Sequence, residues 1–326
     1  MDQNNTPQAE KNPGLAMMEA GDLAGARDAF EQALTLDEDI FGPESKEVAA
    51  DVRYLGNVLC RMGDFAGARP HFERALRISQ TAFGFDSAET AVDAGNLGVV
   101  LQQLQDFHAA RQHFELARKN DEIALGANHP QVAIDLTRIA GLLLETGSLK
   151  EARDIYERVL EIDEAAFGTE SLDVVEDLNH LSQVHVKLGD LVAARTCLER
   201  MIKAGERMFG AGHPQTAAFF SKLGGVVQAQ SDLPAAAELY RKALEINRAA
   251  LGESHQALAR DWNNLGVVLE KTKDKAAATE AYGKALEIME ALLPADHPYL
   301  EGARKNLARL EKGEDDAPKP QRWILS

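Results

Sequence analysis

Histidine is the residue type whose spacing in this 326-residue chain most suggests chemistry. Zinc held by histidines needs ring nitrogens at about 2.0–2.1 Å, so its ligands must converge on one point. Four histidines recur at multiples of 42 residues, which places them in separate repeats. Other histidines form pairs five residues apart, which diverge on a helix because facing positions are three or four apart. We therefore expect no metal site and expect the periodic histidines to start helices; the residues are His129, His213, His255 and His297, with the pairs His108/His113 and His180/His185.

Other catalytic signals are weak. No nucleophile, base and acid stand together in a recognisable pattern, and Gly210-Ala211-Gly212 lacks the third glycine of a dinucleotide-binding fingerprint. Cys60 and Cys197 lie more than three repeats apart, so we expect reduced cysteines rather than an intramolecular disulfide. The sequence predicts a protein that is not an enzyme and needs no cofactor.

Amide and cationic side chains recur at fixed positions and suit the recognition of a peptide. Asparagine both donates to and accepts from a ligand backbone, and arginine and lysine attract carboxylates. The alternative is that these polar residues only cover an exposed helix face. The predicted peptide-binding residues are Arg53, Tyr54, Asn57, Asn96, Arg138, Asn179, His180, Gln183, Lys222, Arg260, Asn263, Asn264, Lys305 and Asn306.

Aspartates recur at another position of the same pattern. We expect them to form a ridge on the side of the first helix of each repeat, away from the predicted binding face. This arrangement would give a chain of net charge −17 a neutral-to-basic inner surface. The residues concerned are Asp51, Asp93, Asp135, Asp177 and Asp261.

A 42-residue repeat positions all of these side chains. The pair Leu55-Gly56 returns as Leu97-Gly98, Leu223-Gly224 and Leu265-Gly266, with related pairs between them. A constant period of 20–50 residues is typical of a solenoid. An aromatic or leucine column and an alanine column keep the same phase; they include Phe30, Phe72, Phe114, Tyr156, Leu198, Tyr240 and Tyr282, and Ala26, Ala68, Ala110, Ala152, Ala194, Ala236 and Ala278.

Each repeat reads as two helices joined by a short turn. Apolar residues three and four apart, such as Val48, Val52, Leu55 and Leu59, give the first helix one buried stripe. A glycine can end that helix in the left-handed conformation, and an aspartate after it is a good N-cap for the second helix. The second helix ends at Phe-Gly or Leu-Gly, as in Phe83-Gly84.

These columns resemble tetratricopeptide repeats in the longer form of kinesin light chains. The copy that shows the motif best combines Asn264-Leu265-Gly266, Asp274, Ala278 and Tyr282. The resemblance covers about residues 13–310 and implies an all-α, right-handed α-solenoid of stacked antiparallel helix pairs. It also implies a concave groove, lined by the first helices, that binds peptide segments of partners, and it implies no chemistry.

Composition limits the remaining function classes. The net charge of −17 opposes binding to nucleic acid, and no apolar run approaches the ~18 residues that span a bilayer. The start of the chain has no secretion-signal pattern, so we expect a cytoplasmic protein with no membrane association. We predict a disordered lead-in over 1–12, a solenoid over 13–312 whose first repeat is incomplete and whose last helix is a cap, and an acidic, proline-containing tail over 313–326.

Three functions stay open on these observations. The first is a scaffold that binds an extended, acidic or asparagine-clamped peptide of a protein partner. The second is a regulatory sensor in which the tail, ending in Trp323-Ile324-Leu325, acts as a tethered pseudo-ligand. The third is an accessory subunit of an enzyme. Self-association through the tail or the incomplete first repeat is a further expectation.

Overall fold

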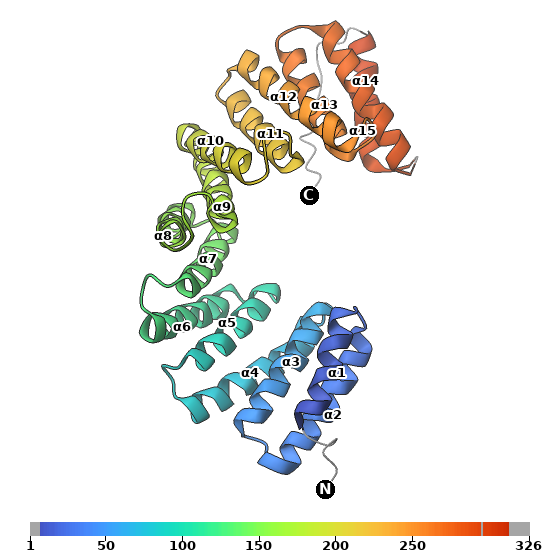
Figure 1. The fold of residues 1–326 in the computed structure, drawn as a ribbon. Helices are drawn as coiled ribbons and strands as arrows, with labels where there is room; N and C mark the ends of the chain where they lie inside the picture. The colour runs from blue at the N-terminus through green and yellow to red at the C-terminus, as the bar shows by residue number, and fades with distance from the viewer. Residues whose placement is uncertain (1–6, 295, 313–326) are drawn as a thin grey trace. The chain divides into compact units, whose positions relative to one another are not determined.

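A computed structural model of the protein describes residues 7–294 and 296–312, which form helices and short turns (Figure 1). We call the first helix of each repeat an A helix and the second a B helix. The A helices are α1 (Pro7–Glu19), α3 (Lys46–Arg61), α5 (Ala88–Gln103), α7 (Pro130–Glu145), α9 (Leu172–Leu188), α11 (Pro214–Ala229), α13 (Gln256–Lys271) and α15 (Pro298–Lys312). The B helices are α2 (Leu23–Phe41), α4 (Phe65–Phe83), α6 (Phe107–Leu125), α8 (Leu149–Phe167), α10 (Leu191–Met208), α12 (Leu233–Leu251) and α14 (Lys275–Leu292).

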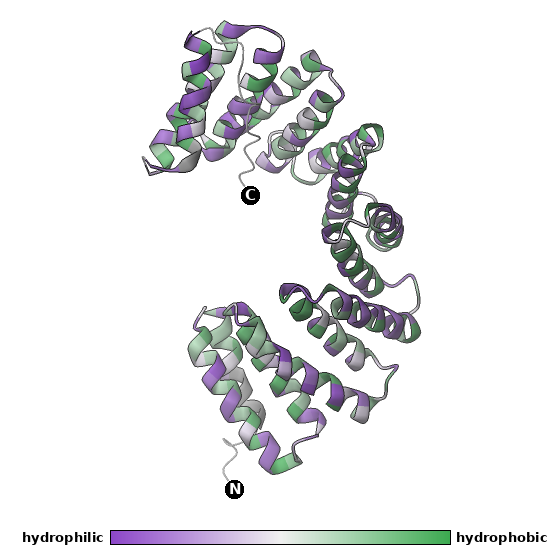
Figure 2. Ribbon diagram, turned by 180° about the vertical axis from the view of Figure 1, so that it is seen from behind, coloured by the Kyte–Doolittle hydropathy of each residue, from purple (hydrophilic) through white to green (hydrophobic). Residues whose placement is uncertain are grey.

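The helices belong to two compact units, residues 1–166 and 167–326. In unit 1, α2 packs between α1 and α3, and the stacking continues through α4, α5 and α6 to α7. In unit 2, α10 packs between α9 and α11, and the stacking continues to α15. Figure 2 shows that each helix carries both apolar and polar residues, as a helix packed on its neighbours requires. The predicted all-α solenoid of helix pairs is confirmed.

The turn inside each repeat has one residue in the left-handed conformation, which is glycine at positions 21, 63, 147 and 189 and Gln105, Ser231 or Lys273 in the other repeats. Gly63 has a φ of 82°, a left-handed conformation that ends α3 at little cost for a residue without a Cβ. Asp64 then accepts a hydrogen bond from the Gly67 N–H at 2.8 Å and caps α4. The periodic histidines cap A helices instead: the Nδ1 atoms of His129, His213 and His255 accept from backbone N–H groups at 3.1, 3.1 and 3.2 Å.

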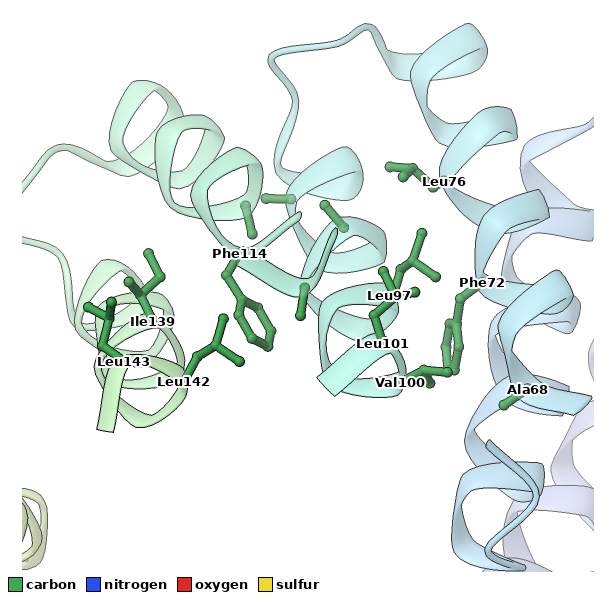
Figure 3. Close-up of a cluster of buried hydrophobic side chains, with 14 of the residues drawn as sticks. Ala68, Phe72, Leu76, Leu97, Val100, Leu101, Phe114, Ile139, Leu142 and Leu143 are labelled. Atoms are coloured by element: carbon green, nitrogen blue, oxygen red, sulfur yellow. The ribbon is translucent and has the colours of Figure 1, made fainter. Parts of the chain in front are cut away.

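Glycines within the A helices face aromatic rings of the B helices. In the core of unit 1, Phe72 and Phe114 lie among Leu97, Leu101 and Ile139 (Figure 3). A Cβ added at Gly98 would lie 2.6 Å from Cδ1 of Phe114, and one added at Gly56 would lie 2.7 Å from Cε2 of Phe72. Close helix approach therefore explains the mid-helix glycines of the Leu-Gly column.

Replacing Gly98 with alanine should destabilise unit 1 by about 1–3 kcal/mol, because the new methyl group overpacks the Phe114 ring. Gly141→Ala is the matched control, since its Cβ would lie 3.8 Å from Oη of Tyr156, an ordinary contact. The control should be neutral, or more stable by up to about 1 kcal/mol through helix propensity. Urea unfolding measures both variants, and equal effects would contradict the packing explanation.

The N-terminal boundary differs from the prediction. The α1 helix begins at Pro7, within the segment predicted as a disordered lead-in, so the first repeat contains both of its helices. Its Gly14 faces Phe30, and a Cβ there would lie 2.8 Å from Cε1 of that ring. The position 42 residues before Gly56 therefore has the same packing role, even though Pro13 replaces leucine. Residues 1–6 and the predicted tail at 313–326 lie outside the described residues.

Candidate peptide-binding faces

The A helices present exposed or half-buried side chains on the side opposite their buried stripe. On α5 these are Val92, Asn96, Val99 and Gln103, which lie four, three and four residues apart and so share one face. In unit 1 we define the apolar–amide face as Asn57, Val92, Asn96, Val99, Gln103 and Ile134, on α3, α5 and α7. In unit 2 we define the cationic face as His180, Gln183, Lys187, Lys222, Arg260, Asn264 and Lys271, on α9, α11 and α13.

Two predicted binding residues of α3 are used in packing. Arg53 donates to both carboxylate oxygens of Asp93 on α5, at 2.6 and 3.0 Å, and Asp93 is fully buried. The Tyr54 ring stacks on Phe30 of α2, with centroids 4.9 Å apart and planes inclined by 10°. Both side chains therefore hold helices together, which reduces what they can offer a ligand.

The aspartates do not form an exposed ridge, and that expectation was wrong. Each of the five is at most 4% exposed, because this side of an A helix meets the preceding repeat rather than solvent. The buried carboxylates also take up predicted binding cations. Arg138 donates to Asp135 at 2.9 Å, and Arg260 donates to Asp261 at 3.3 Å.

Three further predicted residues lie apart from the exposed faces. Asn263 and Asn306 are only 5% and 8% exposed, which leaves little of either amide for a ligand. Lys305 is exposed on α15 and donates to Glu301 at 2.5 Å. It helps to line an open cavity of about 460 Å³ together with Asp296, His297, Glu301, Arg304 and Ala308.

In unit 2 several predicted residues do come together. The Lys222 Nζ donates to Oδ1 of Asn179 at 2.6 Å, which joins α11 to α9. Burial lowers the pKa of Lys222, and the Arg260 guanidinium lowers it further. Burial likewise lowers the pKa of His180, opposed by Glu176 and reinforced by Lys222. A neutral imidazole at this position can both donate and accept hydrogen bonds.

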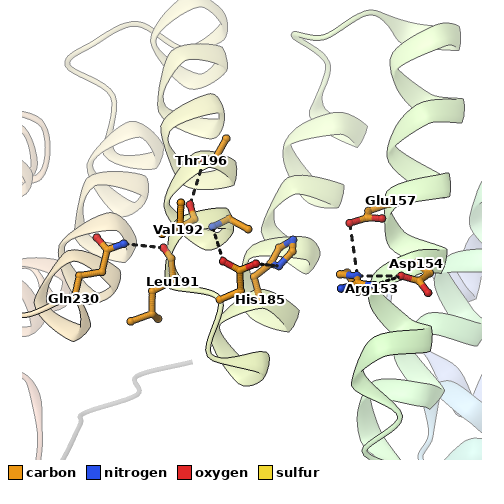
Figure 4. Close-up of polar contacts among 10 residues, drawn as sticks. Arg153, Asp154, Glu157, His185, Leu191, Val192, Thr196 and Gln230 are labelled. Carbon is orange, nitrogen blue, oxygen red and sulfur yellow. Dashed lines mark hydrogen bonds and ion pairs between the residues drawn. The ribbon is translucent and has the colours of Figure 1, made fainter.

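Turns near this face are fixed by polar contacts (Figure 4). The Gln230 amide donates to the Leu191 carbonyl at 3.1 Å, across the ends of two repeats. His185 is 8% exposed, and its Nδ1 lies 3.8 Å from Oδ2 of Asp190. His180 and His185 therefore lie in different environments, as their five-residue spacing on one helix predicts.

Apolar residues on the exposed face of unit 1 were missed by sequence reasoning. Val92, Val99 and Ile134 are 46%, 37% and 48% exposed. Val99 occupies the same repeat position as Asn57 and Gln183, both predicted to bind ligand. The repeat position of Val99 therefore predicts exposure on this face, although its apolar side chain differs from the polar ones of the predicted binding residues.

No helix of residues 7–294 and 296–312 has the length and apolar character that crossing a bilayer requires. Among curated proteins, no sequence matches this chain. The family model described as tetratricopeptide repeat matches overlapping windows along most of the sequence, at residues 7–81, 47–123, 86–165, 133–207, 175–249 and 215–291.

Solved structures with similar folds include other tetratricopeptide repeat proteins. Kinesin light chain-like repeats of Podosopora anserina have a TM-score of 0.57 at 17% identity, over 62% of this chain and 96% of theirs. BtubC of P. vanneervenii has a TM-score of 0.60 at 22% identity, over 73% of this chain and 93% of its own.

A signal transduction ATPase with numerous domains from Pyrococcus horikoshii, which has a tetratricopeptide repeat sensor, has a TM-score of 0.66 at 12% identity, over 96% of this chain and 45% of its own. At these identities the three likenesses concern the fold. The family model matches most of the chain, so the chain belongs to the tetratricopeptide repeat family, and its 42-residue period resembles that of repeats of the kinesin light chain type.

Proposed function

We propose that this protein is a non-enzymatic interaction scaffold whose A helices bind an extended peptide segment of a protein partner. The repeat fold suits this role because it presents successive A helices side by side. The observation that carries the proposal is the cationic face. A chain with net charge −17 places Lys187, Lys222 and Lys271 at exposed positions of three A helices of one unit.

The cationic face fits an acidic peptide segment. Lys222 contacts an amide rather than a carboxylate, so its charge is not neutralised by that contact. Glu270 lies near this face but binds Arg309 at 2.6 Å and the Tyr282 hydroxyl at 3.1 Å. Glu176 is exposed on α9 and reduces the net positive charge at that end of the cationic face. Gln183 and Asn264 add groups that can hydrogen-bond a peptide backbone.

The apolar–amide face fits a peptide segment with apolar side chains. Single exposed apolar residues are common on protein surfaces. Here, however, Val92, Val99 and Ile134 stand on two A helices of unit 1, with Asn96 between the two valines on α5. Apolar contacts would supply affinity, and the amides would orient the ligand backbone.

To test the proposal, short peptides that bind the full chain are selected from a displayed peptide library. Fluorescence polarisation then measures the affinity of each selected peptide. Reversing the charges of Lys187, Lys222 and Lys271 to glutamate should weaken acidic peptides at least about tenfold, since each lost charge contact removes a fraction of a kcal/mol or more. Added salt should weaken parental binding in the same direction. Val92→Ser with Ile134→Ser should weaken peptides that carry apolar side chains.

The matched control reverses three cations on B helices, Lys203, Arg241 and Lys275, all of which are exposed. It makes the same change in net charge away from the proposed face. Equal weakening by the two triple variants would contradict the proposal, because it would show a non-specific charge effect. Binding of a folded partner that no short peptide displaces would also contradict it and would favour an accessory subunit.

A further inference from the structure

The buried aspartates of the A helices occupy one repeated structural position. Each lies 14 residues after a position on the preceding B helix, which holds Asp37 before Asp51, Ser79 before Asp93, Asp121 before Asp135, Asp163 before Asp177 and Asn247 before Asp261. All of these side chains are at most 8% exposed. A buried carboxylate needs partners that compensate its charge and hydrogen-bond its lone pairs. The residue on the B helix therefore affects how readily each aspartate can be ionised.

At two of these sites the partners are donors. Asp93 accepts from the Ser79 hydroxyl at 2.6 Å and from Arg53 at 2.6 and 3.0 Å. Asp261 accepts from the Ser221 hydroxyl at 2.6 Å and from the Asn247 amide at 2.8 Å. Hydroxyl, amide and guanidinium groups all donate to an ionised carboxylate. At Asp261 burial raises the pKa, but Arg260, Ser221 and Asn247 oppose that effect.

The Asp121–Asp135 site differs from these two at both partner positions, and it pairs two acids, as the Asp37–Asp51 and Asp163–Asp177 positions also do. A second acid, Asp121, replaces Ser79 and Asn247 on the B helix. Gly95 stands on the preceding A helix where Arg53 and Ser221 stand in the other two sites, and it has no side chain to donate. Arg138 fills part of this space: a Cβ added at Gly95 would lie 2.8 Å from its Nη1 atom, which donates to Asp135 at 2.9 Å.

The charged surroundings leave this site one cation for two acids. On α7, Arg138 is the cation that pairs with Asp135. His129, the cap of α7, acts on Asp121 from outside the helix, and Gln131 is a neutral partner. On α6, Arg118 and Glu122 pair with each other at 2.5 Å.

Small and apolar residues of the neighbouring helices pack around α7. The α5 helix contributes Gly95, and α8 packs against α7 with Val159 and Ile162. Burial raises the pKa of Asp135 to about 7, opposed by Arg138 and reinforced by Asp121. Burial also raises the pKa of Asp121, opposed by Asp135, Arg138 and His129.

We propose that Asp121 and Asp135 share one proton and form a pH-sensitive contact between α6 and α7 that weakens when the proton leaves. With the proton present, one carboxyl donates to the other, and Arg138 compensates the remaining charge. Without it, both buried carboxylates are charged while Arg138 donates to one of them, and like charges at short range repel. The contact responds to pH whether or not the proposed peptide binding is correct.

The direction of the pH dependence follows from the sign of the shift. A carboxyl whose pKa is higher in the folded chain binds a proton that the unfolded chain has already released. Its contribution to stability is therefore complete below about pH 4 and is lost as the pH rises to about 7. Above that range both states are ionised and the loss is constant.

Asp121→Asn is the sharpest test, because it copies the Asn247–Asp261 pair found in the same chain. An amide at this position can donate to an ionised Asp135. Thermal unfolding of the full chain should show the variant melting several degrees above the parent at pH 8, with the difference shrinking toward pH 5. Carbon NMR of labelled aspartate carboxyls should show one titration near pH 7 that is present in the parent and lost in the variant, while signals from the other buried aspartates appear in both spectra.

The reciprocal variant Asn247→Asp builds two acids at the Asp261 site and keeps the test decisive if the first variant folds poorly. It should lower the melting temperature at pH 8 more than at pH 5. Parallel melting curves of the parent and Asp121→Asn across this pH range would overturn the proposal. So would the absence of any carboxyl titrating near neutral pH in the parent.

Discussion

Replacing Arg53 with methionine should lower the free energy of unfolding by about 3–5 kcal/mol, because it leaves the buried Asp93 carboxylate without its cation. Arg53 binds both oxygens of Asp93, and the side chain of Asp93 is 0% exposed. Ser79 still donates at 2.6 Å but carries no charge. Methionine keeps an apolar stem of similar reach, so the change removes mainly the charge. Urea unfolding gives the loss directly.

The control for Arg53 is Arg69→Met in the same unit. Arg69 pairs with Glu73 at 2.6 Å, but both side chains are almost half exposed, so the expected loss is below about 1 kcal/mol. Adding Asp93→Asn to Arg53→Met should recover part of the stability, since it removes the uncompensated charge. A stable Arg53→Met variant that loses peptide affinity would instead make Arg53 a ligand-binding residue, as the sequence suggested.

Truncating Arg309 to alanine should detach the last helix from unit 2, at a cost of about 3–5 kcal/mol. Its guanidinium is 9% exposed and donates to Glu270 of α13 at 2.6 Å. The Tyr282 hydroxyl of α14 donates to the other oxygen of Glu270 at 3.1 Å. Burial raises the pKa of Tyr282, and the neighbouring Glu270 carboxylate raises it further. The hydroxyl therefore keeps its proton and remains a donor.

Hydrogen exchange along α15 measures this effect where it should occur. The terminal helix of a repeat array packs on one side only, so loss of its anchor should increase exchange there before unit 2 unfolds. Arg304→Ala is the control on the same helix, because the Arg304–Glu290 pair is 47% and 44% exposed and should contribute less than about 1 kcal/mol. Full protection of α15 in the Arg309 variant would show that apolar packing alone holds the cap.

The helix pairs and their turns were predictable because their causes are local. Apolar spacing, a glycine with positive φ and an aspartate N-cap act within a few residues, as at Gly63 and Asp64. Residues 7–12 were the exception: proline and polar residues suggested a lead-in over 1–12, yet α1 begins at Pro7. The packing of Gly14 against Phe30 could be predicted from the 42-residue period alone, because Gly14 lies one period before Gly56.

The direction in which each polar side chain points was decided by the tertiary structure. Periodicity placed Arg53, Arg138 and Arg260 near one another in the repeat pattern, but it did not reveal that each binds a buried aspartate. The sequence by itself determined the period, the helices, the caps and the family, because these depend on residues close in the chain or on exact repetition. Only the folded structure decided which charges are buried, because that depends on partners up to 40 residues away and on whether a neighbour such as Gly95 offers a donor.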